Sequence, residues 1–215
     1  MASPSVTSST YTPAELSYLL AGRDNAEAVR ARSILGLEEF TEGDPRILPA
    51  VQSLSSKGLV TAIDDDVAIS ETAQALGYLI GNANDWTRIA LLADGRVEAL
   101  VVLSAPGVDG GLILRADRMG NYEAVATLPG VHPTQVTGSI ISGYLSQWAE
   151  VTVSLHRDLD ERATALVMEH VASGDFVITK RTGLAGPDVT DDPVVVTEAE
   201  YLADLEAILA DGEPA

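Results

Sequence analysis

The chain has 215 residues, and its 32 acidic and 13 basic side chains give a formal net charge of −19. Binding to nucleic acid or to an anionic membrane surface requires exposed cations, so this charge argues against both partners. The sequence contains no cysteine, which excludes disulfides, thiolate zinc sites and cysteine nucleophiles.

The N-terminal segment carries no sign of export. Residues 1–11 are rich in Ser and Thr and are predicted to form a disordered tail. They show neither the charge nor the apolar run of a secretory signal, and no stretch of 18 apolar residues follows. We therefore expect a cytoplasmic protein without membrane insertion. Two lysines against eleven arginines are typical of a GC-rich genome such as that of an actinobacterium.

Residues 12–84 are predicted to be mainly helical. Thr12, Pro13 and Glu15 form a helix start with a capping box. Further helices are expected at residues 25–35, 45–57 and 70–80, with a short hairpin at 59–69 before the last of them. Three helices, a hairpin and a helix are the layout of a winged helix, so we assign residues 12–84 to a winged-helix-like part.

Residues 85–215 are predicted to be rich in strands. Asp94-Gly95 is a strong hairpin turn signal between strands at 86–93 and 96–103. Further strands are expected at 112–116, 122–127, 148–155 and 176–180, and helices at 134–147, 158–172 and from Thr197, with a loop at 183–192. This order predicts an α+β fold with a mainly antiparallel sheet flanked by helices, packed with residues 12–84 as one unit.

Two phrases of the sequence echo each other. Gly77-Tyr78-Leu79 ends a predicted helix shortly before Trp86, and Gly143-Tyr144-Leu145 ends another shortly before Trp148. Two copies would form a pseudo-twofold arrangement with strands from both halves in one sheet. Chance similarity between short apolar phrases is the alternative explanation.

The three histidines do not have the spacing of metal ligands. His132 lies beside Pro133 in a predicted loop and is expected to face solvent. His156 is expected at a strand end, and His170 late in a helix, where it would interact favourably with the helix dipole. We predict no catalytic or metal-binding role for any of them.

The acidic and glycine-rich segments also lack the patterns of known sites. Asp64-Asp65-Asp66 is expected to be a solvated turn, because the spaced ligands of a calcium loop are missing. Asp158, Asp160 and Glu161 are expected in the first turn of a helix. Gly107–Gly111 and Gly138–Gly143 lack the lysine of a phosphate-binding loop, and the former is expected to join two strands. We predict no enzymatic activity, no cofactor and no catalytic, cofactor or metal residues.

A DNA-binding function would require a recognition helix, and residues 45–57 are the candidate. They offer Arg46, Gln52 and Lys57, with the two cations at opposite ends. Base readout uses several such side chains on one face, and the aspartates at 64–66 would repel phosphate. Nucleic acid is therefore an unfavourable partner.

Several features together resemble the EspG family, the cytosolic chaperones of actinobacterial type VII (ESX) secretion. They are the helix beginning at Glu15-Leu16-Ser17-Tyr18, the phrase Ser53-Leu54-Ser55-Ser56-Lys57-Gly58-Leu59-Val60, the strand at Trp86-Thr87-Arg88-Ile89 and the half-repeat at Trp148. The resemblance implies an antiparallel sheet flanked by helical groups that binds the helical tip of a secreted substrate. Members of that family are longer, so no binding residues are transferred and the binding surface is left unassigned.

The residues alone leave two other functions open. One is a winged-helix transcriptional regulator whose C-terminal part senses a ligand or forms a homodimer. The other is an acidic, immunity-like protein that neutralises a basic partner. In each case we expect the protein to act by binding a macromolecule.

Overall fold

The computed structural model describes residues 9–63, 66–159, 162–184 and 192–210. It has a mixed α+β fold with a nine-stranded antiparallel sheet, a separate two-stranded hairpin and, in these ranges, six helices. None of these helices is long and apolar enough to cross a membrane. The elements are β1 (Ser9–Tyr11), α1 (Pro13–Leu19), α2 (Ala26–Leu35), α3 (Ile47–Ser56), β2 (Val60–Ile63), β3 (Asp66–Ile69), α4 (Glu71–Gly81), β4 (Asp85–Ala93), β5 (Arg96–Ser104), β6 (Leu112–Ala116), β7 (Tyr122–Ala126), α5 (Pro133–Gln147), β8 (Val151–Leu159), β9 (Arg162–His170), β10 (Phe176–Thr182), β11 (Val194–Val196) and α6 (Glu198–Leu209).

The large sheet is built from two meanders. Its strand order is β1-β7-β6-β5-β4-β8-β9-β10-β11, and every pair is antiparallel. The central pair is β4 and β8, and each of these strands follows a helix, α4 or α5. The order of helix and strands is therefore the same in both halves, while the internal repeat itself stays a prediction.

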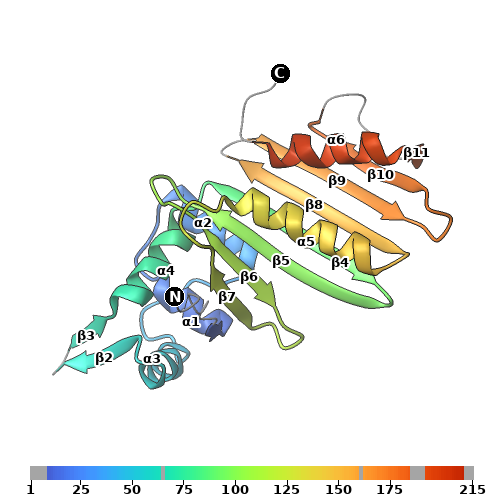
Figure 1. The fold of residues 1–215 in the computed structure, drawn as a ribbon. Coiled ribbons are helices and arrows are strands. Elements are labelled where there is room, and N and C mark those ends of the chain that lie inside the picture. The colour runs from blue at the N-terminus through green and yellow to red at the C-terminus, as the bar shows by residue number, and fades with distance from the viewer. Residues whose placement is uncertain (1–8, 64–65, 160–161, 185–191, 211–215) are drawn as a thin grey trace, which may run out of the picture.

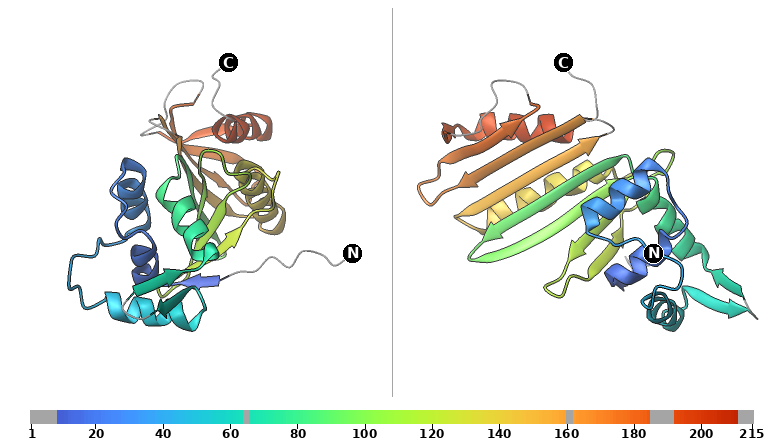
Figure 2. Two further views of the ribbon diagram at one scale, coloured as in Figure 1. Left: turned by 90° about the vertical axis from the view of Figure 1, so that its left-hand side faces the viewer. Right: turned by 180° about the vertical axis from the view of Figure 1, so that it is seen from behind.

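Helices cover the two faces of the sheet unequally (Figure 1). Figure 2 shows α5 and α6 on one face and α1, α2 and α4 on the other, over the half that contains β4 to β7. Each covered region has its own apolar core. The first core joins the N-terminal helices to the sheet through Leu16, Leu20, Leu54, Ile80 and Trp86. The second packs α5 and α6 on the opposite face through side chains such as Ile141, Tyr201 and Leu205.

The capping box predicted for α1 is present and is tied to the rest of the N-terminal region. The Glu15 carboxylate accepts a hydrogen bond from Thr12 N at 2.7 Å, and Glu15 N donates to Thr12 Oγ1 at 3.2 Å. Lys57 Nζ, just after α3, lies 2.6 Å from the same buried carboxylate and donates to the Thr10 carbonyl in β1. Burial alone would raise the pKa of Glu15, but the hydrogen bonds from Lys57 and Thr12 outweigh it and lower this pKa below its ordinary value.

Two predictions about secondary structure were wrong. The helix expected at 158–172 is instead the end of β8 and the strand β9, which pair from Leu159 opposite Arg162 onward. The strand expected at 148–155 accordingly begins and ends later. Residues 9–11, expected in the disordered tail, form the edge strand β1 on β7; residues 1–8 lie outside the described ranges.

Candidate functional site

Half of the sheet carries helices on only one face. Seen from behind, β8, β9, β10 and the adjoining ends of β4 and β5 have no helix in front of them (Figure 2, right). We call this surface the open face. Strand register places these side chains on it: Ala90, Leu92, Val97, Ala99, Thr152, Ser154, His156, Ala165, Val167, Glu169, Val177, Lys180, Thr182 and Val195.

Small and β-branched side chains dominate the open face. One continuous row crosses six strands in the order Val97, Leu92, Thr152, Glu169, Val177, Val195. The two ends of this row are the most exposed, with Val97 at 70% and Val195 at 68%. Sheets with one solvated face usually alternate apolar and polar residues, so exposed valines on that face indicate a contact surface for another molecule.

A charged cluster borders the open face beside α2. The Asp158 carboxylate lies 3.2 Å from Arg88 Nη2, 3.2 Å from His156 Nε2 and 3.6 Å from Arg30 Nη2. Two arginines and a histidine thus surround one carboxylate. Although the chain as a whole has a large acid excess, the two arginines make this border locally positive. An acidic group of a partner could bind there.

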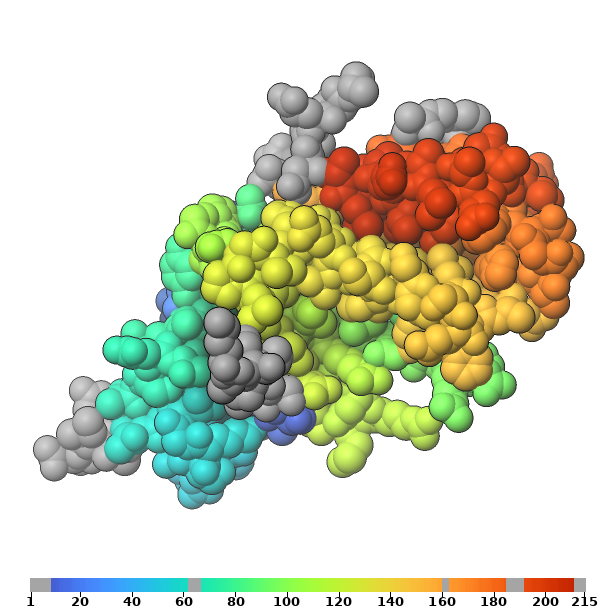
Figure 3. Space-filling model, in the orientation of Figure 1, coloured from blue at the N-terminus to red at the C-terminus, as the bar shows by residue number. Residues whose placement is uncertain are grey.

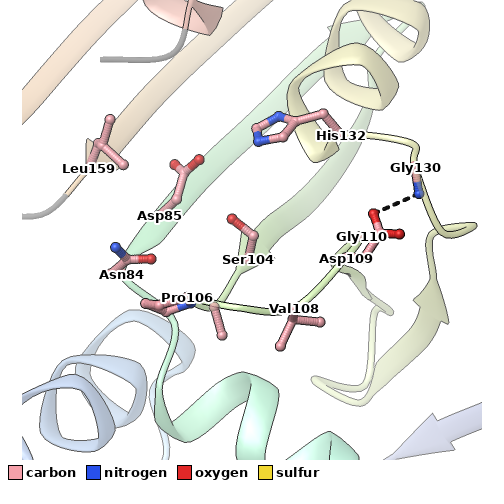
Figure 4. Close-up of a pocket in the computed structure, with 11 residues that line it drawn as sticks. Asn84, Asp85, Ser104, Pro106, Val108, Asp109, Gly110, Gly130, His132 and Leu159 are labelled. Carbon is pink, nitrogen blue, oxygen red and sulfur yellow. Dashed lines mark hydrogen bonds between the residues drawn. The ribbon is translucent and has the colours of Figure 1, made fainter. Parts of the chain in front are cut away.

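A second candidate region is a cavity of about 310 Å³ at the N-terminal end of β4, lined by residues that include Asp85 and Leu159. Figure 4 shows Asp85, Ser104 and His132 from three different segments pointing toward its interior. Behind it, Arg157 binds both carboxylate oxygens of Asp85, at 2.8 and 3.0 Å, and both side chains are almost fully buried. Arg157 Nη1 also donates to the carbonyls of Ile208 and Ala210, so this ion pair fixes the end of α6.

The cavity contains serine, histidine and aspartate but does not connect them as a catalytic triad. A nucleophilic serine must bond to its base, and the base to an orienting acid. The Ser104 hydroxyl makes no hydrogen bond to any described residue, and the Asp85 carboxylate is held by Arg157. His132 instead caps α5, with Nδ1 2.8 Å from Thr134 Oγ1. Asp109 accepts the Gly130 N–H at 2.8 Å, which ties two loops of the rim together (Figure 4).

The histidines lie in other settings than the sequence predicted. His132 is partly buried as the N-cap of α5 and does not simply face solvent. His156 lies inside β8 on the open face, and His170 is the last residue of β9, packed 4.7 Å from the Phe176 ring. The helix dipole expected to favour His170 is therefore absent, because no helix forms there.

The other segments singled out in the sequence also have defined places. Asp158 lies in β8 and not in the first turn of a helix, while Asp160, Glu161, Asp64 and Asp65 fall outside the described residues. Gly107–Gly111 joins β5 to β6 as predicted, and Gly138–Gly143 lies within α5. Among the described residues, no group of three or more His, Asp or Glu side chains is placed to hold a metal ion.

Both cations of the candidate recognition helix are already engaged. Arg46 forms ion pairs with Asp44 and Glu38, and its guanidinium lies over the Phe40 ring. Lys57 pairs with Glu15. Because Arg46 and Lys57 are both held in ion pairs, residues 46–57 offer no unpaired cation to a phosphate group.

Comparison with known proteins gives no family assignment, since the chain matches no protein-family model and no curated protein sequence.

The open face was not predicted from the sequence, although its signal is present. Residues 151–156 alternate strictly, with Val151, Val153 and Leu155 buried and the residues between them on the open face. Because residues 158–172 were predicted to be a helix, the sequence did not predict β9, the neighbouring strand that widens the open face.

Proposed function

We propose that this protein is a non-enzymatic protein-binding protein that holds its partner on the open face of the sheet. The observation that carries this proposal is the row of partly exposed side chains from Val97 to Val195, on a half of the sheet that helices cover on one side only. Flat apolar surfaces of this kind are typical of protein–protein contacts. The two arginines at its border suit a partner with acidic groups near an apolar centre.

We further propose that the protein works in the cytoplasm as a chaperone or adaptor for a helical secreted substrate in type VII secretion. The support is the sequence resemblance to the EspG family, whose members bind the helical tips of such substrates. An open sheet face next to a helical group would accommodate an amphipathic helical tip, which buries its apolar stripe against an apolar surface. We also propose that residues 12–84 form a winged-helix-like part and that the two halves of the sheet are a pseudo-twofold repeat.

A matched pair of double variants tests the binding surface. Thr152→Arg with Val195→Arg places two long charged side chains on the open face. Ser142→Arg with Leu202→Arg places the same charges on the exposed sides of α5 and α6. We expect the wild type and the second variant to capture small helical secreted proteins from the native host and to bind them again after purification. The first variant should bind them at least tenfold more weakly.

The same experiment separates the proposal from the other two functions. Equal binding by both double variants would show that the partner does not use the open face. Recovery of a single basic toxin would favour an immunity protein. Salt-sensitive binding of genomic DNA by the purified wild type would favour a transcriptional regulator and contradict the chaperone.

The internal repeat has its own test. Superposing residues 70–116 on 134–181 in an experimental structure should align a helix and the strands that follow it. A fit in which the helices and strands do not coincide would show that the sequence echo arose by chance.

A further inference from the structure

The sheet divides between β5 and β6. Strand β5 pairs with β4 over its full length, Arg96–Ser104, but with β6 only from Leu100 to Leu103. Residues 96–99 therefore have a strand on one side only. Figure 1 shows the β6–β7 hairpin bending away from the β4–β5 hairpin, and Figure 3 shows an opening between their tips.

Hollows lie on both sides of the sheet at this division. The one below α5 has a volume of about 500 Å³ and is lined by residues that include Arg96, Arg115, Arg118 and Trp148. The other, of about 460 Å³, opens on the open face. Ala116 lines both hollows, so each lies close to the unpaired edge of β5.

The unpaired edge presents backbone hydrogen-bonding groups. The two-residue turn Asp94-Gly95 places Arg96 opposite Ala93, and in such hairpins this pair exchanges both backbone hydrogen bonds. Even-numbered residues of β5 therefore point their N–H and C=O groups toward β4. The bond from Asn84 N to the Ser104 carbonyl, 3.2 Å, agrees with this alternation. It follows that the N–H and C=O groups of Val97 and the N–H of Ala99 point into the opening, because the pairing of Leu100 with Arg115 engages the Ala99 carbonyl with β6.

The tips of both hairpins have defined conformations. Asp94 and Gly95 adopt φ values of 49° and 67°, as a tight two-residue turn requires. At the other tip, the Asp117 side chain accepts hydrogen bonds from Met119 N and from both the backbone and side-chain nitrogens of Asn121, all within 3.0 Å. Each turn is thus defined by its own residues.

The side chains at the opening indicate which partner would fit. Arg96 and Arg118 make no ion pair or side-chain hydrogen bond to any described residue. Beside them, Val97 is 70% exposed and Met119 is 85% exposed. Other cations are already paired with carboxylates: Arg30, Arg46, Lys57, Arg88, Arg115, Arg157 and Arg181. The opening therefore combines free guanidinium groups, apolar side chains and an unpaired strand edge.

Residues 1–8 and 211–215 do not match this chemistry. Residues 1–8 contain no Asp or Glu. Residues 211–215 follow Ala210, whose carbonyl is held by Arg157 near Asp85, at the far end of β4 from Ala93. The length of β4 is about 27 Å, whereas five extended residues span at most about 18 Å.

We propose that the unpaired edge of β5 binds an extended segment of another protein in which acidic residues alternate with apolar ones. The segment adds as a strand through the N–H and C=O groups of Val97 and the N–H of Ala99. Its carboxylates pair with Arg96 and Arg118, and its apolar residues contact Val97 and Met119. This is β-strand addition at a sheet edge, with charge selecting the sequence. This contact adjoins the one proposed for the open face and shares Val97 with it, but it uses the strand edge and not the face of the sheet.

A pair of synthetic peptides tests this site. Fluorescein-labelled acetyl-Val-Glu-Val-Glu-Val-Glu-amide and its Lys-for-Glu counterpart would be titrated with the purified chain at low salt and followed by fluorescence anisotropy. We expect the glutamate peptide to bind at least tenfold more tightly. The double variant Arg96→Glu with Arg118→Glu should reverse this preference. Thr152→Arg with Val195→Arg should leave it unchanged, which separates failure of this site from failure of the proposed function.

Backbone pairing is tested at Ala99. Ala99→Pro removes an N–H that points into the opening but leaves the bonds to β4 intact, and proline is tolerated at strand edges. It should weaken binding at least fivefold, whereas Ala99→Ser should not. In the wild type, the amide resonances of Val97 and Ala99 should shift on peptide addition, a result that does not depend on any variant folding. Equal affinity for both peptides, no binding at millimolar peptide, or unshifted amides at both positions would overturn the proposal.

Discussion

At the residue scale, we expect mutation of the ion pair between Asp85 and Arg157 to lower the stability of the fold strongly. It joins the first residue of β4 to β8 and to the last carbonyls of α6, out of contact with water. Removing one member of a buried ion pair leaves the other charge uncompensated. We expect Asp85→Asn to lower the free energy of unfolding by about 3 kcal/mol in urea denaturation. Arg88→Gln, in a more exposed pair with Asp158, should change it by less than about 1 kcal/mol. Equal effects would show that burial does not control the energetics.

Tyr201 is a residue whose polar group works against stability. Its ring is fully buried and stacked 4.8 Å from Phe176, while its hydroxyl has no hydrogen-bond partner in the described structure. Burial raises the pKa of Tyr201 above its ordinary value of 10.0. Because the unfolded chain then loses this proton at lower pH than the folded one, stability falls as the pH rises above about 10.

Tyr201→Phe should therefore raise the free energy of unfolding at neutral pH by about 1 kcal/mol. The gain over the wild type should grow above pH ~10, where only the wild type loses stability through this group. Urea denaturation at pH 7 and at alkaline pH measures both effects. A loss of stability at neutral pH would show that the hydroxyl is bonded in solution.

At the element scale, α4 and α5, the two helices that precede the meanders, differ in how tightly a glycine of each is packed. A Cβ on Gly77 in α4 would lie 2.8 Å from the Leu19 carbonyl oxygen, whereas a Cβ on Gly143 in α5 would meet no atom within 4 Å. Close approach of the α4 backbone to the Leu19 carbonyl at the end of α1 therefore requires glycine at position 77. We expect Gly77→Ala to lower the thermal midpoint and Gly143→Ala to raise stability by up to about 1 kcal/mol through helix propensity. A stabilising Gly77→Ala would contradict this account.

Helices and turns that are specified by neighbouring residues could be predicted from the sequence. Strands that depend on pairing with distant residues could not. Capping at Thr12, Ser70 and Thr197 and the turn at Asp94-Gly95 correctly marked three helix starts and a hairpin. In contrast, β9 contains Ala, Leu, Met and Glu, which favour helices, and the sequence between β8 and β9, Asp160-Glu161, contains no glycine. Pairing with β8 and β10 overrides that preference, and pairing between distant strands has no local signature. The open face could not be located for the same reason.

At the scale of the whole molecule, charge is the dominant property. Most cations are used in local ion pairs, so the excess of acidic side chains remains as mutual repulsion across the surface. We expect the thermal midpoint to rise as sodium chloride is increased from low concentration to about 0.3 M, because screening weakens that repulsion. Differential scanning calorimetry in buffers of one pH measures the change. A midpoint that falls over this range would show that the ion pairs outweigh the repulsion.

The position of β1 has a consequence for how the chain folds during synthesis. This first strand pairs with Tyr122–Ala124 of β7, near the middle of the sequence, and Lys57 attaches it to α1 and the end of α3. Until the ribosome has released β4 to β7, the N-terminal helices therefore have no sheet on which to bury Leu16 and Leu20. A nascent chain of this protein exposes apolar helix faces for the time needed to translate about half of its length, and these intermediates are the species most prone to aggregate.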